Sequence, residues 1–387
     1  MKNDLFAALL LLAASCGGPR PSGCEAEAPV VLRPERSGGV APADLIADYR
    51  YVPLGDTRQP VGEIDQLLLT DERIIVVDRQ RARAVFVFDR DGRLCAEIAA
   101  WGRGPQEYAS LDHVALVPGR TPQLALVDAH ARKALFYDLD GHFLRTAAIP
   151  FPFSGLEFLG PDAAIGYADG YTARHDPFFR ERSDAGDLLF FMDGDFRIRR
   201  SALPCRTEHR EAGYTAPSVR RCGESCLIHP VLCDTIYRTD GETLLPLYRL
   251  DLSRLGAARP EPDALSDREI RELGGRVPLF WGDFIPGERF LFFRVSVPPE
   301  QENLLFVRSE CSGEVLPVLN SVRSGDAALA DVAFQTLRTS WRDEFVATIP
   351  GFVVPMICRD GTDNPLLRTL GEDSNPVLVF YRLREAG

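Results

Sequence analysis

Four cysteines crowd into one stretch of the chain and are the residues best placed for metal or redox chemistry. They are Cys205, Cys222, Cys226 and Cys233, and His229 lies among them. Thiolate and imidazole groups bind zinc, but the spacing C-x3-C-x2-H-x6-C is not typical of structural zinc sites. Cysteines of exported proteins more often pair with each other or lie buried as small apolar side chains. We therefore expect a local disulfide among these four, with its connectivity open, and no metal or other cofactor.

Arginines recur at one position of an internal repeat, where they could bind an anion. Arg83 and Arg132 occupy equivalent places before a tight turn, and their planar guanidinium groups could grip a carboxylate or sulfate group. Asp78 and Asp128 also recur and could bind a metal or a sugar. Equivalent repeat positions can instead stabilise each unit against its neighbour. We prefer that interpretation for the arginines and leave both open for the aspartates.

The segment 102–108 reads GRGPQEY and is a further candidate site. Arg103 and Glu107 could line one face of the protein and meet a polar ligand. Two glycines and a proline also fix a sharp connection, which Tyr108 could anchor by packing. A structural role is the preferred interpretation. The ligand-binding candidates are therefore Arg103, Glu107 and Tyr108 of this segment, together with Arg83 and Arg132.

No linear motif points to catalysis. The six histidines form no H-E-x-x-H pattern, and no G-x-S-x-G, P-loop or G-x-G-x-x-G is present. Carboxylates are abundant but scattered, so no catalytic residue can be named. A site assembled from several loops would leave no such motif. The net charge of −12 argues against nucleic acid as a partner.

The N-terminus reads as a lipoprotein signal peptide over residues 1–15. Lys2 is followed by an apolar run at 5–14, which is too short to cross a bilayer but suits a secretory signal. The run ends in LAASC, so signal peptidase would leave Cys16 as a lipidated N-terminus. An ordinary signal peptide with an incidental cysteine is the alternative. We expect a flexible tether over 16–45 and the folded body over 46–387.

An internal repeat predicts the fold of this body. Residues 78–98 and 128–147 align as strand, Asp-x-Asp-Gly turn and strand, with Gly92 opposite Gly141. Related turns follow at Gly194, Gly241 and Gly313. The first three intervals are 49, 53 and 47 residues, which is the length of a four-stranded propeller blade with its connections. Adding a terminal unit from about residue 345, we predict an all-β, six-bladed β-propeller.

Two further features complete this prediction. The strand-like segments 49–54 and 377–383 lie at opposite ends of the body, and their pairing would close the ring and hide two sheet edges. The interval before Gly313 is longer, and 260–275 shows a capping box and a Gly-Gly stop. We expect a small helical insertion there.

The same chain resembles the six-bladed β-propeller lipoproteins abundant in Bacteroidota, and more distantly NHL repeats. The resemblance is densest over 51–145 and at the C-terminus. It rests on these segments: YVPL at 51–54, GEID at 62–65, VFDRDG at 87–92, GRGPQEY at 102–108, DTIY at 234–237 and NPVLVFYRL at 375–383. It implies a fold and an envelope location, and it brings no activity or catalytic residue.

These observations favour a non-catalytic binding or scaffold module for a peptide, glycan or protein partner. The alternative is a hydrolase or lyase with a site built from loops at the central channel. We expect a monomer that contacts the membrane only through its lipid. The nearest acidic residues after Cys16 are Glu25 and Glu27, beyond a Gly/Pro stretch. Their distance favours the periplasmic side over the cell surface.

Overall fold

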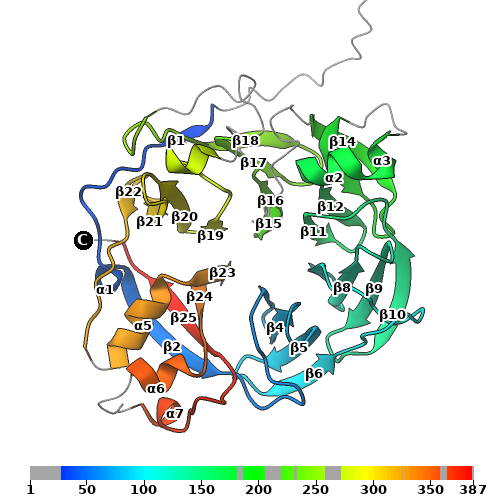
Figure 1. Ribbon diagram of the computed structural model, residues 1–387, viewed down its shortest axis with the longest axis horizontal. Coiled ribbons are helices and arrows are strands. Elements are labelled where there is room, and N and C mark those ends of the chain that lie inside the picture. The colour runs from blue at the N-terminus through cyan, green and yellow to red at the C-terminus, as the bar shows by residue number, and fades with distance from the viewer. Residues whose placement is uncertain are drawn as a thin grey trace, which may run out of the picture.

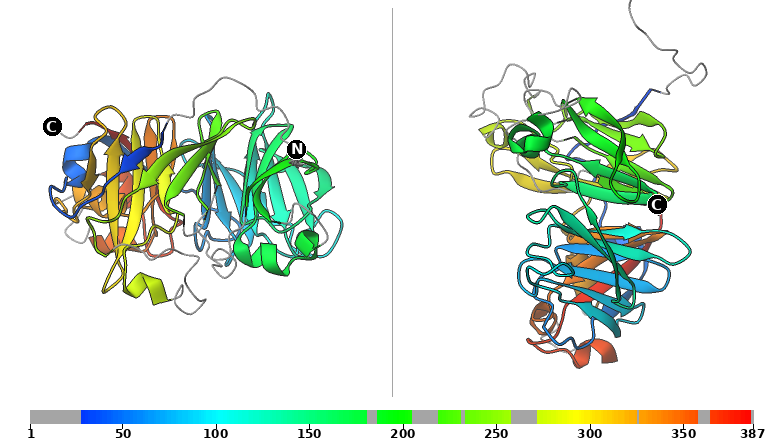
Figure 2. Two further views of the ribbon diagram at one scale, coloured as in Figure 1. Left: turned by 90° about the horizontal axis from the view of Figure 1, so that it is seen from above. Right: turned by 90° about the vertical axis from the view of Figure 1, so that its right-hand side faces the viewer.

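The chain folds into a ring of β-sheets. The computed structural model describes residues 28–180, 186–204, 219–230, 233–257, 272–324, 326–357 and 364–385. Within them, six sheets surround a central axis like the blades of a propeller (Figure 1). Seen edge-on, the ring is a thick disc (Figure 2). The predicted six-bladed β-propeller is confirmed.

Blades 1 to 3 each contain four antiparallel strands that run in order from the channel to the rim. Blade 1 comprises β3 (Gln66–Leu69), β4 (Arg73–Asp78), β5 (Ala84–Asp89) and β6 (Leu94–Ile98). Blade 2 comprises β7 (His113–Val117), β8 (Gln123–Asp128), β9 (Lys133–Asp138) and β10 (Phe143–Ala148). Blade 3 comprises β11 (Gly155–Gly160), β12 (Ala163–Tyr167), β13 (Asp187–Met192) and β14 (Ile198–Pro204).

Blades 4 to 6 repeat this order, with additions from the N-terminal part of the chain. Blade 4 comprises β15 (Val219–Cys222), β16 (Ser225–Ile228), β17 (Thr235–Thr239) and β18 (Leu244–Leu250), with β1 (Val30–Leu32) as a fifth strand. Blade 5 comprises β19 (Phe284–Pro286), β20 (Phe290–Val297), β21 (Glu302–Ser309) and β22 (Val315–Pro317). Blade 6 comprises β23 (Leu337–Trp341), β24 (Glu344–Ile349), β25 (Val377–Leu383) and β2 (Ile46–Pro53).

The two chain ends close the ring as predicted. Strand β2 pairs antiparallel with β25 from Ile46 opposite Leu383 to Pro53 opposite Val377. The start of the body therefore supplies the outermost strand of the last blade. This pairing hides two edges that would otherwise be open to other chains.

Part of the expected tether is folded onto the propeller. Strand β1 lies parallel to β18, with Val30 opposite Tyr248, and Val40 bridges to Val318. The short helix α1 (Pro42–Leu45) then leads into β2. The assignment of 16–45 to a flexible tether is therefore wrong for residues 28–45, because their apolar side chains pack against blades 4 and 5.

The repeated turns join the third and fourth strands of blades 1 to 5. Gly92 and Gly141 have φ of 86° and 85°, the left-handed conformation that glycine adopts without strain. In blade 3 the equivalent residue is Phe196 (φ 61°), not Gly194 as the sequence indicated. Phe196 is buried against other phenylalanine rings, and this packing offsets its backbone strain.

The other helices of the described residues are short. They are α2 (Gly170–His175), α3 (Pro177–Arg180), the 3-10 turn η3 (Leu273–Gly275), α5 (Asp326–Phe334), α6 (Val353–Ile357) and α7 (Pro365–Arg368). Of the predicted insertion at 260–275, residues 260–271 lie outside the described part, and η3 occupies its end. No helix in the described ranges has the length and apolar content needed to cross a bilayer.

The blade order gives the ring two different faces. Each blade starts at its innermost strand, and successive strands run in opposite directions. The connections from one blade to the next, here called crossings, and the loops between second and third strands therefore lie on one side of the ring, here called the loop face. The tight turns lie on the other side, the hairpin face. Helices α2, α3, α6 and α7 all belong to loop-face connections, and Figure 2 shows α2 and α3 projecting together from one side.

The core lies between neighbouring blades. On β5, Phe86 and Phe88 pack toward blade 6, whereas Val85 and Val87 pack toward blade 2. Both faces of each central strand are buried, which explains the continuous apolar runs of the sequence.

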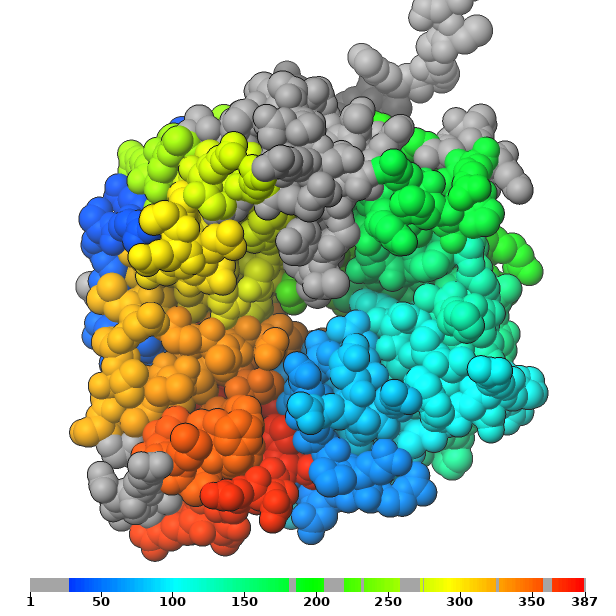
Figure 3. All heavy atoms as spheres, in the orientation of Figure 1, coloured from blue at the N-terminus to red at the C-terminus, as the bar shows by residue number. Residues whose placement is uncertain are grey.

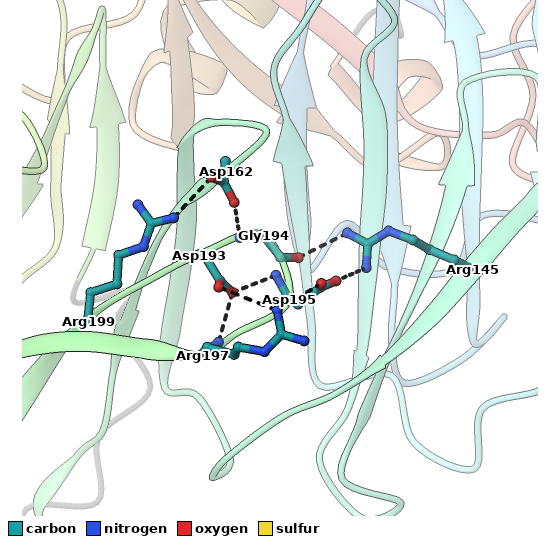
Figure 4. A network of polar contacts seen from close by, with 7 residues as sticks. All are labelled: Arg145, Asp162, Asp193, Gly194, Asp195, Arg197 and Arg199. Atoms are coloured by element: carbon teal, nitrogen blue, oxygen red, sulfur yellow. Dashed lines mark hydrogen bonds and ion pairs between the residues drawn. The ribbon is translucent and has the colours of Figure 1, made fainter.

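An arginine stacked on a phenylalanine recurs on the outermost strand of three blades. Arg145 on β10 lies opposite Phe136, its Cζ 3.6 Å from the ring centroid. Its guanidinium reaches blade 3, donating to the carbonyl oxygen of Gly194 (2.9 Å) and to Asp195 (2.8 Å) (Figure 4). The planar fork of arginine suits this double role.

The same geometry occurs at equivalent positions elsewhere in the ring. Arg200 stacks on its cross-strand partner Phe191 at 3.4 Å and donates to the carbonyl oxygen of Gly241 in blade 4. Arg50 stacks on its partner Phe380 at 3.9 Å. We call these three pairs the arginine clasps.

We predict that Arg145→Lys lowers the free energy of unfolding by roughly 1–2 kcal/mol, because lysine keeps the charge but loses stacking and fork geometry. Urea unfolding of the purified chain measures this. The control is Arg197→Lys, at an exposed ion pair in the same turn (Figure 4), where a change within about 0.5 kcal/mol is expected. Equal effects of the two substitutions would contradict the clasp.

Candidate functional site

The centre of the ring contains a cavity of about 1140 Å³, open to solvent. The space-filling view shows the opening where the blades converge (Figure 3). Its wall is built from the six innermost strands and the residues that flank them. Apolar and aromatic side chains, among them Leu68, Leu116, Phe153, Ile285 and Trp341, alternate with charged ones.

An inner strand has no neighbouring strand on its channel side, so its backbone groups need other partners. Side chains of the adjacent blade supply several. Gln66 donates to the carbonyl oxygen of Val114 (2.6 Å) and accepts from its N–H (3.2 Å), joining blades 1 and 2. Arg221 on β15 donates to the carbonyl oxygen of Phe158 (2.9 Å), joining blades 4 and 3.

His113 makes the corresponding contact between blades 2 and 3. Its Nε2 lies 2.8 Å from the carbonyl oxygen of Leu156. Burial lowers the pKa of His113 to about 4, so the imidazole is neutral at physiological pH and donates to this oxygen. His113 is therefore a structural residue of the wall.

The seams of blade 6 are joined in the same way. Arg294 donates to the carbonyl oxygen of Gln335 (2.7 Å), and the Ser340 hydroxyl donates to the carbonyl oxygen of Pro286. Trp341 Nε1 donates to Asp71 (3.2 Å), which links blade 6 to blade 1.

Glu157 and Arg220 are the charged pair at the centre of the wall. Glu157 on β11 is half-buried and faces Arg220 and Arg221 of β15. Desolvation raises the pKa of Glu157 to about 7, although both arginines oppose this shift. Burial also lowers the pKa of Arg220 from its usual value. The Nε of Arg220 has no hydrogen-bond partner among the described residues.

The carboxylates at the loop-face mouth are engaged by the protein itself. Asp65 accepts from the N–H of Arg79 (2.6 Å), and Asp112 accepts from the Ser110 hydroxyl (2.5 Å). Asp169 caps α2 through the N–H of Thr172, and Asp283 pairs with Arg294. These carboxylates hold loops and an arginine in place.

Of the predicted ligand-binding residues, Arg83 and Arg132 lie away from the cavity. Both adopt a left-handed conformation in the turn between second and third strands. The guanidinium of Arg83 lies over Trp101 at 4.4 Å. That of Arg132 donates to the carbonyl oxygen of Pro150 and pairs with Asp176. Each arginine thus contacts the connection to the next blade.

The GRGPQEY segment lies in the crossing from blade 1 to blade 2, outside the cavity wall. Glu107 accepts from the N–H of Gly104 (2.8 Å), which closes the loop on itself. Tyr108 is fully buried and donates to the carbonyl oxygen of Arg83 (2.7 Å). Arg103 is exposed on the loop.

The repeated aspartates tie these crossings down. Asp78 accepts from the N–H groups of Gly62 and Glu63, and Asp128 accepts from that of Ala109. Both carboxylates are fully buried. Their recurrence reflects the same loop-holding task in blades 1 and 2.

The cysteine cluster forms no disulfide within the described residues. Cys222 and Cys226, on neighbouring strands β15 and β16, are free thiols, and burial raises the pKa of both. Cys205 lies outside the described residues, so a disulfide with it stays a prediction. The Nε2 of His229 lies 2.7 Å from the carbonyl oxygen of Cys233. Throughout the described ranges, no three His, Cys, Asp or Glu side chains are arranged to hold a metal.

The channel residues could not be predicted from the sequence, because the inner strands are short and lack the repeated turn that marks blades 1 to 5. The one available signal was the adjacent pair Arg220 and Arg221, charged residues inside a strand-length segment next to an apolar one. Glu157 gives no such signal, because it is a single carboxylate in an otherwise apolar strand.

A family model described as a domain of unknown function, DUF4934, matches residues 36–382. The chain belongs to this family. No curated protein matches it. Among solved structures, a Bacteroides fragilis protein named as exported has 16% identity and a TM-score of 0.71, covering 92% of this chain and 100% of its own. A member of the DUF4221 family from Bacteroides vulgatus has 10% identity and a TM-score of 0.51, covering 89% of this chain and 98% of its own.

At these identities the likeness shows the fold alone. The predicted resemblance to propellers of Bacteroidota is confirmed for the fold, and both relatives come from Bacteroides. The lipid anchor and the kinship with NHL repeats stay predictions.

We predict that Glu157→Gln stabilises the DUF4934 protein at pH 8 more than at pH 5. In the unfolded chain this carboxyl ionises near its usual pKa of 4.5, whereas in the fold it ionises near 7. Stability is therefore lost as pH rises between these values, by up to roughly 2–3 kcal/mol, and glutamine avoids the loss. Urea unfolding of both chains across this range measures it, and a pH-independent difference would contradict the raised pKa.

Proposed function

We propose that this protein is an envelope-tethered binding module that holds a ligand in the central channel of its propeller without converting it. The observation that carries this proposal is the cavity of about 1140 Å³ lined by all six blades. Its size exceeds the 300–1,000 Å³ typical of small-molecule pockets. Part of a peptide or a glycan would fit inside.

The composition of the wall supports binding. Aromatic and aliphatic side chains offer apolar contact to a sugar ring or a peptide side chain, and the charged groups between them would fix its orientation. Phe153 and Trp341 are aromatic residues of this wall.

Binding is favoured over catalysis because the histidine and the mouth aspartates of the wall, its candidates for acid–base chemistry, are engaged in the structure of the ring. His113 and the mouth aspartates each hold a backbone group or an arginine. One observation favours the alternative of a hydrolase or lyase: the pKa of Glu157 lies near 7, where a general acid works well. Turnover of a bound ligand that Glu157→Gln abolishes would establish that alternative.

The envelope location rests on the sequence of the N-terminus. The LAASC segment favours lipidation at Cys16, and the exported Bacteroides relative is compatible with secretion. We place the propeller on the periplasmic side as a monomer, with the lipid as its only membrane contact. Rapid cleavage by protease added to intact cells would instead place it on the cell surface.

We predict that Cys16→Ser releases the protein from the membrane fraction into the soluble fraction and abolishes metabolic labelling with a fatty acid, because the acylated thiol is the anchor. Fractionation and labelling in an expressing cell measure both effects. Cys24→Ser, eight residues further on, is the matched control and should change neither. Retention of the label in Cys16→Ser would contradict lipidation at this residue.

We also predict that Leu68→Trp, which fills the channel, abolishes ligand-induced thermal stabilisation in a screen of glycans and peptides. A ligand at 100 times its Kd adds about 2.7 kcal/mol, which is measurable as a shift in Tm. The control Leu144→Trp lies exposed on the outer strand β10 and should keep the shift. A ligand that stabilises both variants equally would place the site outside the channel.

A further inference from the structure

We propose that the ligand of the central channel carries an oxyanion, a carboxylate or sulfate group, that binds to Arg220. This inference rests on the proposed function, because it names the chemistry that the channel would recognise.

The inner strands carry a charge opposite to that of the whole chain. They contain three arginines, Arg220, Arg221 and Arg338, and one glutamate, Glu157. The chain as a whole has a net charge of −12. The cavity lining as a whole has eight carboxylates and six arginines, but every carboxylate except Glu157 lies on a connection that flanks the strands. The positive charge is therefore concentrated on the inner strands, and it favours an anionic ligand in the middle of the channel.

Arg220 has donors to spare. It lies between Glu157 of blade 3 and Asp283 of blade 5, its Cζ 5.7 Å from the centroid of the Phe284 ring. Asp283 already forms a bond of 2.8 Å with Arg294. The Nε of Arg220 is buried with no hydrogen-bond partner among the described residues. An unmade bond to a buried guanidinium is costly, so an incoming oxyanion that makes it would be bound.

Arg338 adds a second charge to the same cavity. It lies on β23 with its side chain exposed, and it lines the cavity wall. In the described part of the chain, its guanidinium has no ion pair or hydrogen bond. Arg221, by contrast, is held by the carbonyl oxygens of Phe158 and Gly223.

Glu157 would act as the internal counterion that the ligand replaces. The groups facing it are Arg220 and Arg221 from β15 and Cys226 from β16, while His113 from β7 binds the adjacent carbonyl oxygen of Leu156. His113 and the Cys226 thiol are neutral near pH 7, because burial lowers the pKa of the first and raises that of the second. An oxyanion on Arg220 would repel ionised Glu157, so binding is coupled to uptake of a proton by this carboxyl.

The test is equilibrium dialysis of the chain that begins at Cys16 with labelled sulfate and, separately, labelled acetate, at pH 6 and pH 8 and constant ionic strength. Both anions are fully ionised over this range. With a pKa of about 7 for Glu157, linkage makes binding about tenfold tighter at pH 6 than at pH 8. A preference for sulfate or for acetate then distinguishes a sulfated from a carboxylated ligand.

Three variants decide the outcome. Arg220→Gln should weaken binding at least tenfold at pH 6. Glu157→Gln should remove the pH dependence and bind at pH 8 as tightly as the unmodified chain does at pH 6, which keeps the test valid even if Arg220→Gln folds poorly. Arg199→Gln, at an exposed ion pair of the hairpin face (Figure 4), should change nothing.

Anion binding that is unaltered in both Arg220→Gln and Glu157→Gln, or no anion binding at all, would overturn the inference. The proposed function would still stand if a neutral ligand were found whose binding Leu68→Trp abolishes. The two proposals can therefore fail separately.

Discussion

The structure depends on one constraint: each innermost strand of the propeller has an edge without a neighbouring strand. The backbone groups on this edge must find partners, or the ring would lose several hydrogen bonds at every seam. Gln66, His113 and Arg221 meet this need by reaching across to the next blade. The polar wall of the channel is thus first a structural necessity. Once these bonds are made, the charged side chains that remain for a ligand are chiefly Arg220, Arg338 and Glu157.

The outer parts of the blades are joined by a different device. Three arginines stack on phenylalanines of their own blade, and those in blades 2 and 3 bind a turn of the next one. Such a contact covers an aromatic face and satisfies a turn carbonyl at once, which lysine could not do.

The two faces of the ring differ for a topological reason. Since every blade begins at the channel, the long connections collect on the loop face and the tight turns on the hairpin face. Function therefore has most freedom to vary on the loop face, where loops can change without disturbing the sheets. The described aspartates of that face nevertheless serve the fold, as the bonds of Asp78 and Asp128 to their crossings show.

The sequence by itself determined the fold, because a related turn recurs at near-constant intervals in blades 1 to 4 and again in blade 5, and the β2 and β25 segments are strand-like at opposite ends. It also indicated which positions repeat, although it could not tell that Arg83 and Arg132 contact crossings and not a ligand. Only the tertiary structure decided the site. Arg220 and Glu157 lie 63 positions apart in different blades, and what makes each of them unusual is burial beside the other, which no local pattern of residues records.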